Sequence, residues 1–147
     1  MIKVYTDGSS LGNPGNGGWA FLVVRENNIS FRSGFEKNTT NNRMELLAAI
    51  KALEFLNDCT NFSINTDSNY VKLGITTWIF NWKKNNWKTS TKQLVKNKDL
   101  WEKLDNLSLR KNINWNWVKA HNISKLNNQV DELARKAAKT LTESSFN

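Results

Sequence analysis

The sequence predicts a single α/β domain with a mixed sheet, and three features of the chain lead to this prediction. Short apolar segments separated by turn residues fill its first third, which is the pattern of an antiparallel meander. A long amphipathic helical segment follows. The next apolar segment comes directly after that helix, so it is expected to pair parallel to an earlier strand. The length of 147 residues fits one domain, 1–147, without an internal repeat or linker.

The elements of the first half are bounded by turn-forming Gly, Pro and Asn residues. Period-2 and β-branched patterns place strands at 1–6, 19–26, 29–36 and 62–66. A Gly-rich loop at 11–18 separates the first two strands. The helix at 41–57 precedes the fourth strand, and its apolar stripe consists of Leu46, Ala49, Ile50 and Leu53.

The second half alternates helices with one further strand. Ser68 is expected to cap a helix that Gly74 ends, and Thr77 to cap a second segment that runs to residue 84. The remaining predicted elements are an amphipathic helix at 99–107, a fifth strand at 113–118 and a last helix at 127–141. The apolar face of the last helix consists of Val130, Leu133, Ala134, Ala137 and Leu141.

Composition excludes several classes of protein. Hydrophobic residues make up 39% of the chain, which is typical of a globular fold and not of a disordered one. Cys59 is the single cysteine, so an internal disulfide and a Cys-rich zinc site are excluded. The first residues contain no long apolar run, so no signal peptide or membrane span is predicted. We therefore expect a cytoplasmic protein, and we expect it to be a monomer.

The positive charge is concentrated in one segment. The formal net charge is +8, and the range 83–98 holds six lysines and no acid. Such a block indicates a polyanion or an acidic membrane face as partner, although a surface tuned for solubility has the same pattern. Solubility does not require tryptophans, and four lie in or beside the block: Trp78, Trp82, Trp87 and Trp101. Lysines attract phosphates and exposed rings stack on bases, so nucleic acid is the favoured partner.

Certain acids are not explained by a solvated surface. Asp7 and Asp67 each follow an apolar strand segment, and parallel neighbours would bring both carboxylates to one sheet edge, where ligands bind. Each could instead cap the next turn. Glu45 lies above an apolar line on its helix without a lysine at i+3 or i+4. Asp131 lies beside the apolar face of the last helix, where a salt bridge to Arg135 is the simpler explanation.

Acids that gather at a sheet edge repel one another, and a bound divalent cation resolves the repulsion. The candidate ligands are all oxygens, so Mg²⁺ or Mn²⁺ is the expected ion. A hard cation beside a basic, aromatic surface is the equipment for metal-assisted hydrolysis of a phosphodiester.

Five motifs in order resemble the type 1 ribonuclease H family, often called ribonuclease HI in bacteria. They are YTDGSSLGNPGNGGWA, TTNNRMELLAAIKAL, INTDSNYV, WVKAH and DELARKAA. The segment NWKKNNWKTSTKQLVKNKDLWEKLD is similar to the family's basic protrusion, at about 77–98 here. The resemblance implies a five-stranded mixed sheet, three antiparallel strands then parallel ones, flanked by helices. It also implies an endoribonuclease that cleaves the RNA strand of RNA–DNA hybrids and leaves 5′-phosphate and 3′-hydroxyl ends.

The resemblance assigns roles to the acids. Asp7, Glu45, Asp67 and Asp131 match the family's metal-binding carboxylates. Two Mg²⁺ ions in the substrate complex are implied, about 3.5–4 Å apart and bridged by Asp7, with Mn²⁺ as a possible substitute. Asp131 would hold the metal on the attacking side.

The only histidine, His121, matches the family's catalytic histidine, which helps to move a proton or to release product. A lone histidine is often structural. The family usually has Gly where Ala120 stands, and the loop at 122–124 here lacks the Gly or Pro that often follows.

Several residues match or replace family positions that contact the hybrid, or lie in the basic protrusion. They are Asn13, Thr40, Asn41, Asn42, Arg43, Asn69, Trp78, Trp82, Lys83, Lys84 and Lys88. Thr40 and Arg43 are expected to grip DNA phosphate. Turn and cap chemistry is the competing explanation for the asparagines.

Two functions from other classes compete with this hypothesis. A DNA nuclease or strand-transfer enzyme can share the fold, but the five motifs and the basic protrusion argue against it. A hybrid-binding module without catalysis would not need the intact acids.

Overall fold

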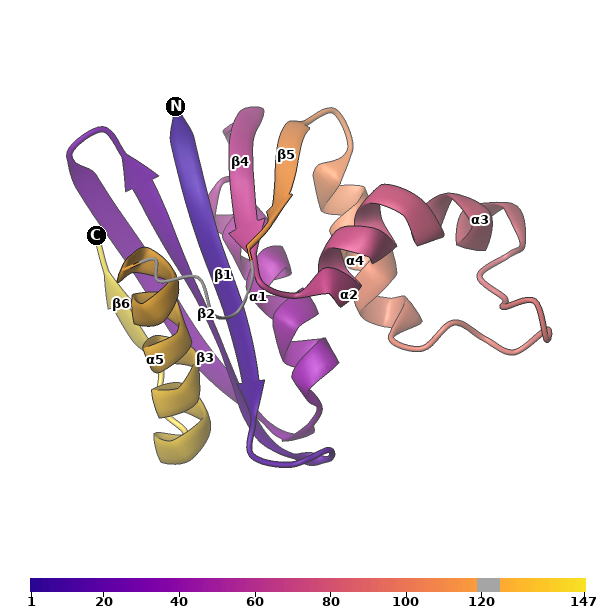
Figure 1. The fold of residues 1–147 in the computed structure, drawn as a ribbon, viewed down its shortest axis with the longest axis horizontal. Coiled ribbons are helices and arrows are strands. Elements are labelled where there is room, and N and C mark those ends of the chain that lie inside the picture. The colour runs from indigo at the N-terminus through magenta and orange to yellow at the C-terminus, as the bar shows by residue number, and fades with distance from the viewer. Residues whose placement is uncertain (119–124) are drawn as a thin grey trace.

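Strand β1 (Ile2–Ser10) lies inside a six-stranded mixed sheet with the order β5-β4-β1-β2-β3-β6 (Figure 1). The computed structural model describes residues 1–118 and 125–147. The other strands are β2 (Gly15–Arg25), β3 (Asn28–Thr39), β4 (Asn61–Thr66), β5 (Asn112–Trp117) and β6 (Ser144–Phe146). Strand β2 pairs antiparallel with β1 and β3, whereas β4 pairs parallel with β1 and β5. The predicted meander and the predicted parallel pairing are confirmed.

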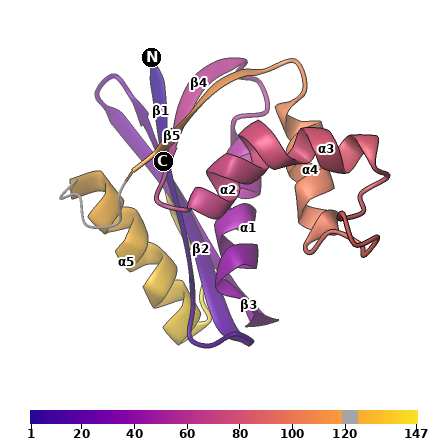
Figure 2. The same cartoon turned by 45° about the vertical axis from the view of Figure 1, so that its right-hand side comes forward.

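Helices cover both faces of this sheet (Figure 2). They are α1 (Asn41–Phe55), α2 (Asn69–Leu73), the π-helical turn η1 (Gly74–Trp78), α3 (Ile79–Lys84), α4 (Lys98–Ser108) and α5 (Lys125–Thr140). Helix α1 packs on one face with α4 behind it, and α5 packs on the other. Within the described residues, none of the helices has the length and apolar character needed to span a membrane.

Strand β2 is apolar almost throughout because it is buried on both faces. Trp19, Phe21 and Val23 face the core under α1, whereas Ala20 and Leu22 face α5. Alternate side chains of a strand point to opposite faces, so a strand covered on both sides needs apolar residues at every position. The predicted α1 stripe is confirmed, because all four of its residues are fully buried. In α5, Val130, Ala134 and Ala137 are buried as predicted.

The sixth strand, β6, is absent from the sequence-based prediction. It has three exposed residues and pairs antiparallel with the edge of β3. Three side-chain contacts hold it: the hydroxyls of Ser33 and Ser144 lie 2.5 Å apart, the Phe31 and Phe146 rings stack at 5.9 Å between centroids, and Arg32 donates to the Phe146 carbonyl at 3.4 Å. A strand this short carries no period-2 signal, so its pairing depends on contacts that only the folded chain makes.

Helix α2 ends before Gly74 as predicted, but the chain stays helical beyond it, and the prediction that Thr77 caps a new helix is wrong. The chain passes from α2 through η1 into α3 without a break, and Gly74 keeps right-handed helical angles of φ −60° and ψ −51°. Glycine is needed there for space. An added Cβ would lie 1.9 Å from Cη2 of Trp101, which is fully buried beneath the helix.

Replacing Gly74 with Ala is expected to lower the free energy of unfolding by about 1–3 kcal/mol, the usual cost of overpacking a core. In a domain of this size each kcal/mol lowers the melting temperature by about 2–4 °C. Thermal unfolding measures the effect, with Thr77→Ala as a control because Thr77 is exposed on the same helical segment. If Gly74→Ala melts with the wild type, Trp101 has room to move and the packing argument fails.

Candidate active site

The close approach of α1 to β1 at Gly8 builds the site. An added Cβ at Gly8 would lie 2.3 Å from the backbone of Met44 and Glu45, so only glycine admits the helix here. The Gly8 N–H donates to Oε1 of Glu45 at 2.5 Å and to Oδ1 of Asp7 at 2.9 Å. One backbone donor therefore orients two carboxylates from different elements.

Strand register brings Asp67 to the same place. Thr6 of β1 is opposite Thr66 of the parallel strand β4, so the next residues, Asp7 and Asp67, emerge at the same edge of the sheet. Asp7 lies within β1, which continues to Ser10, and not at the predicted strand end. Trp117, at the end of β5, donates from Nε1 to the Asp67 carbonyl at 3.2 Å. Sequence reasoning missed this anchoring role of Trp117.

The three acids form one cluster. Oxygen atoms of Asp7, Glu45 and Asp67 all lie within 4.8 Å of one another. Asp7 is 5% exposed and Glu45 is 6% exposed. Asp131, from α5, lines the same cleft of about 210 Å³, together with Thr6, Asp7, Asp67, Asn127, Asn128 and Val130. The structure thus brings together all four predicted metal-binding acids. Asp131 also makes the expected ion pair with Arg135 on its own helix.

Burial and mutual repulsion disfavour the charged forms of the two buried acids. Burial, and then the Asp67 charge, raise the pKa of Asp7 to about 8. Burial, and then the Asp7 charge, raise the pKa of Glu45 well above its usual range. Oδ1 of Asp67 is buried and has no hydrogen-bond partner among the described residues. Carboxylates that repel one another, one with a bare buried oxygen, fit a hard divalent cation.

A second cavity, of about 350 Å³, lies where α1 begins. Predicted substrate residues line it together with Lys96 and Asn97, which the sequence does not single out; the predicted ones are Asn13, Thr40, Asn41 and Asn42. Cap chemistry is present here as well, because Thr40 accepts from Arg43 N at 3.3 Å and Asn13 Oδ1 accepts from Asn41 N at 3.0 Å. The sequence does not distinguish Lys96 from the other lysines of the basic segment, so the prediction did not single it out.

Arg43 is engaged within the protein. Its guanidinium donates to both carboxylate oxygens of Asp99, at 3.1 and 2.9 Å, and to Oδ1 of Asn97 at 3.1 Å. Asn69, the first residue of α2, is exposed. His121 and Ala120 lie outside the described residues, so the proposed catalytic role of His121 stays a prediction.

The tryptophans of the basic segment pack on one another. Trp101 is fully buried, so its ring is not available to stack on bases. Trp82 contacts the rings of Trp78, Trp87 and Trp101, at 5.3–6.2 Å between centroids. Trp101 belongs to the main core, and Trp82 and Trp87 pack against that core, so the first role of these rings is to attach the basic segment to the domain.

The lysines of the protrusion differ in their partners. Lys83 pairs with Asp105 at 3.1 Å, whereas Lys84 and Lys88 are exposed. The protrusion therefore presents positive charge from Lys84 and Lys88, and also from the exposed Lys92 and Lys96.

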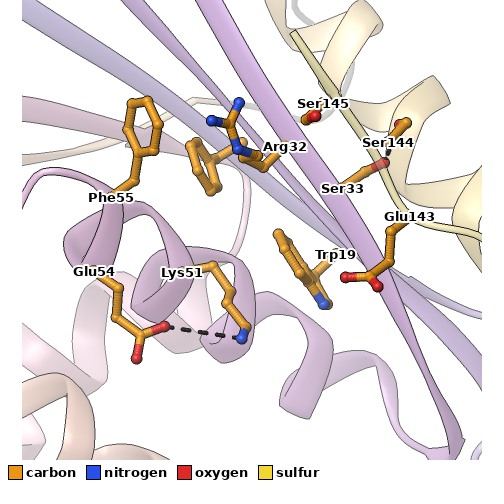
Figure 3. Close-up of a pocket in the computed structure, with 10 residues that line it drawn as sticks. Trp19, Arg32, Ser33, Lys51, Glu54, Phe55, Glu143, Ser144 and Ser145 are labelled. Carbon is orange, nitrogen blue, oxygen red and sulfur yellow. Dashed lines mark hydrogen bonds and ion pairs between the residues drawn. The ribbon is translucent and has the colours of Figure 1, made fainter. Parts of the chain in front are cut away.

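A third cavity, of about 520 Å³, lies between α1 and β6, and its polar groups bind one another (Figure 3). Lys51 lies 3.9 Å from Glu54 and over the ring of Trp19. Arg32 lies over the Phe55 ring at 4.8 Å. Among the described residues that line this cavity, none has a buried side-chain oxygen or nitrogen without a hydrogen-bond partner, in contrast to Asp67 of the acid cluster.

Comparison with known proteins gives consistent matches over nearly the whole chain. The RNase H family profile matches residues 1–139. A ribonuclease H of Francisella philomiragia is 51% identical, over 96% of this chain and 93% of the relative. A ribonuclease HI of Xylella fastidiosa is 53% identical, over 92% and 90%. The crystal structure of LC9-RNase H1, a type 1 RNase H with the type 2 active-site motif, superposes with a TM-score of 0.86 at 30% identity, over 97% of this chain and 74% of that one.

Without metal, the wild type is expected to lose stability relative to Asp7→Asn as the pH rises from about 4 to about 8. The unfolded chain releases the Asp7 proton near pH 4. The folded protein holds this proton up to a pKa of about 8. Ionisation therefore costs folding stability throughout this window, and the cost is constant above it. The amide introduced by the substitution does not titrate and still accepts from the Gly8 N–H. At pH 9 the free energy of unfolding of the variant should therefore exceed that of the wild type by about 0.5–2 kcal/mol.

Thermal melts in chelator from pH 4 to 9 measure this difference, with Asp58→Asn as the control because Asp58 is exposed. Magnesium at about a hundredfold excess over its Kd should then stabilise the wild type by about 2.7 kcal/mol and narrow the gap. A wild type that melts above Asp7→Asn in chelator at pH 8 would mean that the three acids are not a repulsive cluster.

Proposed function

Because the chain belongs to the ribonuclease H family, we propose that it hydrolyses the RNA strand of RNA–DNA hybrids with two divalent metal ions, leaving 5′-phosphate and 3′-hydroxyl ends. The observation that carries the proposal is the cluster of Asp7, Glu45 and Asp67, in which the fold buries Asp7 and Glu45 without a cation among the described side chains. Burying unpaired charge is costly, so a protein that retains such a cluster needs it for a ligand.

The chain's own residues would hold the metal and leave room for the substrate. Asp7, Glu45 and Asp67 supply oxygen ligands from three elements, and Asp131 supplies one from α5 across the cleft. When bound, Mg²⁺ ions would activate the attacking water and stabilise the departing 3′ oxygen. The Gly8 N–H fixes one oxygen each of Asp7 and Glu45, which keeps both side chains from turning away when the cleft is empty. His121 is proposed to assist proton transfer or product release.

Substrate binding is proposed to extend from the acid cleft to the cavity at the start of α1 and then to the basic protrusion. Asn13, Thr40, Asn41 and Asn42 present amides and a hydroxyl at that cavity, which suits contacts to a nucleic-acid backbone and to 2′-hydroxyls. Asn69, Trp78 and Trp82 are proposed to contact the hybrid at the edge of this surface. We also propose that the protein is a cytoplasmic monomer and that it uses Mg²⁺, with Mn²⁺ as a substitute.

Asp7→Asn is expected to reduce Mg²⁺-dependent cleavage by at least about a thousandfold, the scale for loss of an electrostatic catalytic group. Hybrid binding should survive, because the variant removes one negative charge from a site that receives a polyanion. The measurement is cleavage of labelled RNA–DNA hybrid, duplex DNA and duplex RNA side by side, with and without chelator. Wild-type cleavage of duplex DNA, or of hybrid in chelator, contradicts the proposal, as does activity of Asp7→Asn within tenfold of wild type.

Replacing Lys84 and Lys88 with Ala should weaken hybrid binding through lost phosphate contacts. Each lost contact flattens the slope of log K against log salt concentration by about 0.7–0.9. Lys83→Ala should change the slope less, because Lys83 is already paired with Asp105. A double variant of Lys136 and Lys139 on α5 removes equal charge from another helix and should leave the slope unchanged. If the slope of log K against log salt concentration is the same for wild type and for the variant without Lys84 and Lys88, the lysines serve solubility and do not contact phosphate.

A further inference from the structure

Helix α5 packs on β1, β2 and β3 and leaves one face of β4 and β5 uncovered by the described helices (Figure 1). On the opposite face, Ile113 and Trp115 of β5 pack against the main core under α1. Alternate side chains of a strand point to opposite faces, so Asn112, Asn114 and Asn116 belong to the uncovered face. Strand β5 is also the edge of the sheet.

The side chains of the uncovered face lie in rows across the strands. The rows are the pairs Asn112 and Asn61, Asn114 and Ser63, and Asn116 and Asn65, and we call their asparagines the asparagine strip. The next row in the same direction holds Asp67 and, on β1, Asp7, because residues of one face are two positions apart. Successive rows are about 6.6 Å apart along a strand. The asparagine strip is therefore a direct continuation of the acid cluster.

The asparagines of the strip are not explained by turn or cap chemistry, because Asn65, Asn114 and Asn116 lie inside strands. Asparagine is depleted in strands, so its repeated use here opposes local preference. Asn65 is held in place, since it donates to the Val4 carbonyl at 3.1 Å and accepts from Asn116 at 3.4 Å. The exposed side chains of Asn112 and Asn114 have no hydrogen-bond partner among the described residues. Their amides are therefore available to a ligand.

The chemistry of the strip matches that of RNA. A side-chain amide both donates and accepts hydrogen bonds, and so do the 2′-hydroxyl of RNA and the edges of unpaired bases. Lys3, which is opposite Ser63, is exposed and is the single charged residue of the three rows. Its ammonium group attracts phosphates. Neutral amides beside one cation, with no acid in these rows, suit a polyanion that carries hydroxyl groups.

The width of the uncovered face favours one nucleic-acid strand over a duplex. Two β-strands span about 10 Å at a spacing of about 4.8 Å. The major groove of a duplex is by itself about 12 Å wide, so a duplex does not fit between α5 and the edge of the sheet. The acid cluster would cleave the RNA strand of a hybrid, so this strand is the one that passes the row next to the asparagine strip.

We propose that the asparagine strip, together with Lys3, binds an unpaired stretch of the RNA strand where that strand leaves the hybrid. Asn112 and Asn114 hydrogen-bond to 2′-hydroxyls or base edges, and Lys3 contacts a phosphate. This inference rests on the proposed function, because it takes the RNA–DNA hybrid as the ligand of the acid cluster. It extends the substrate from a plain hybrid to a hybrid with a single-stranded RNA flank.

The test compares Kd values in chelator for one short RNA–DNA hybrid with blunt ends and for the same hybrid with unpaired RNA added at its 5′ or its 3′ end. For wild type, unpaired RNA on at least one end should lower Kd about five- to tenfold, the scale of one or two hydrogen bonds between neutral groups. Unpaired DNA of the same length and sequence should give less than about half of this gain, because it lacks the 2′-hydroxyl.

The double variant Asn112→Thr, Asn114→Thr should lose the gain from unpaired RNA. Threonine is favoured in strands, so the variant should fold, and it has the same net charge as wild type. Its Kd for the blunt hybrid and its kcat on that hybrid should stay within about twofold of wild type. Asn106→Gln is the matched control and should keep the full gain, because Asn106 is exposed on α4, which packs behind α1 on the other side of the sheet.

Lys3→Gln tests the same strip from another strand, and it carries the test if the double variant does not fold. It should flatten the slope of log K against log salt concentration by about 0.7 for the RNA-extended hybrid and leave the slope for the blunt hybrid unchanged.

The outcomes separate the two proposals. A wild type that neither binds nor cleaves the blunt hybrid refutes the proposed function. A wild type that cleaves the blunt hybrid but gains nothing from unpaired RNA, or gains equally from unpaired DNA, refutes the role of the asparagine strip alone. The same conclusion follows if the double variant keeps the wild-type gain, or if Lys3→Gln changes both slopes equally.

Discussion

The contact between α1 and β1 at Gly8 is the constraint on which the site depends. A helix can approach a strand this closely only where the strand lacks a side chain, since an added Cβ would lie 2.3 Å from the helix backbone. The approach places Glu45 beside Asp7 and lets one N–H bind both. The parallel pairing of β1 with β4 then brings Asp67 to the same edge of the sheet as Asp7. Position, and not chemistry alone, therefore makes three ordinary acids into a candidate metal site.

The cluster has a cost for folding that the rest of the domain must offset. Its two most buried members have raised pKa values because water has been removed from around them. The strand β2, buried on both faces, and the fully buried α1 stripe supply the apolar burial that offsets this cost. A stable scaffold with a repulsive centre is the usual arrangement when binding energy is reserved for a charged ligand.

Much of this was predictable from the sequence because it rests on local pattern. The strand and helix order, the α1 stripe and the gathering of the acids follow from periodicity and from the positions of Asp7 and Asp67. The misjudged features depend on contacts between distant residues. Gly74 looks like a helix terminator until Trp101 is seen beneath it. The pairing of Arg43 with Asp99, 56 residues later, could not be predicted for the same reason. Strand β6 is too short to show a period of its own.

The pairing of β6 with β3 has a consequence for how the protein behaves at high concentration. An outer strand offers unpaired N–H and C=O groups to any other chain, and proteins that leave such a template open tend to self-associate. Strand β6 covers part of that template, and Phe146 shields Phe31 while remaining 58% exposed itself. Removal of these few residues by a protease would uncover both a backbone template and an aromatic ring. Loss of the last strand is therefore expected to favour self-association, although β6 lies on the opposite side of β1 from β4, whose end is followed by Asp67.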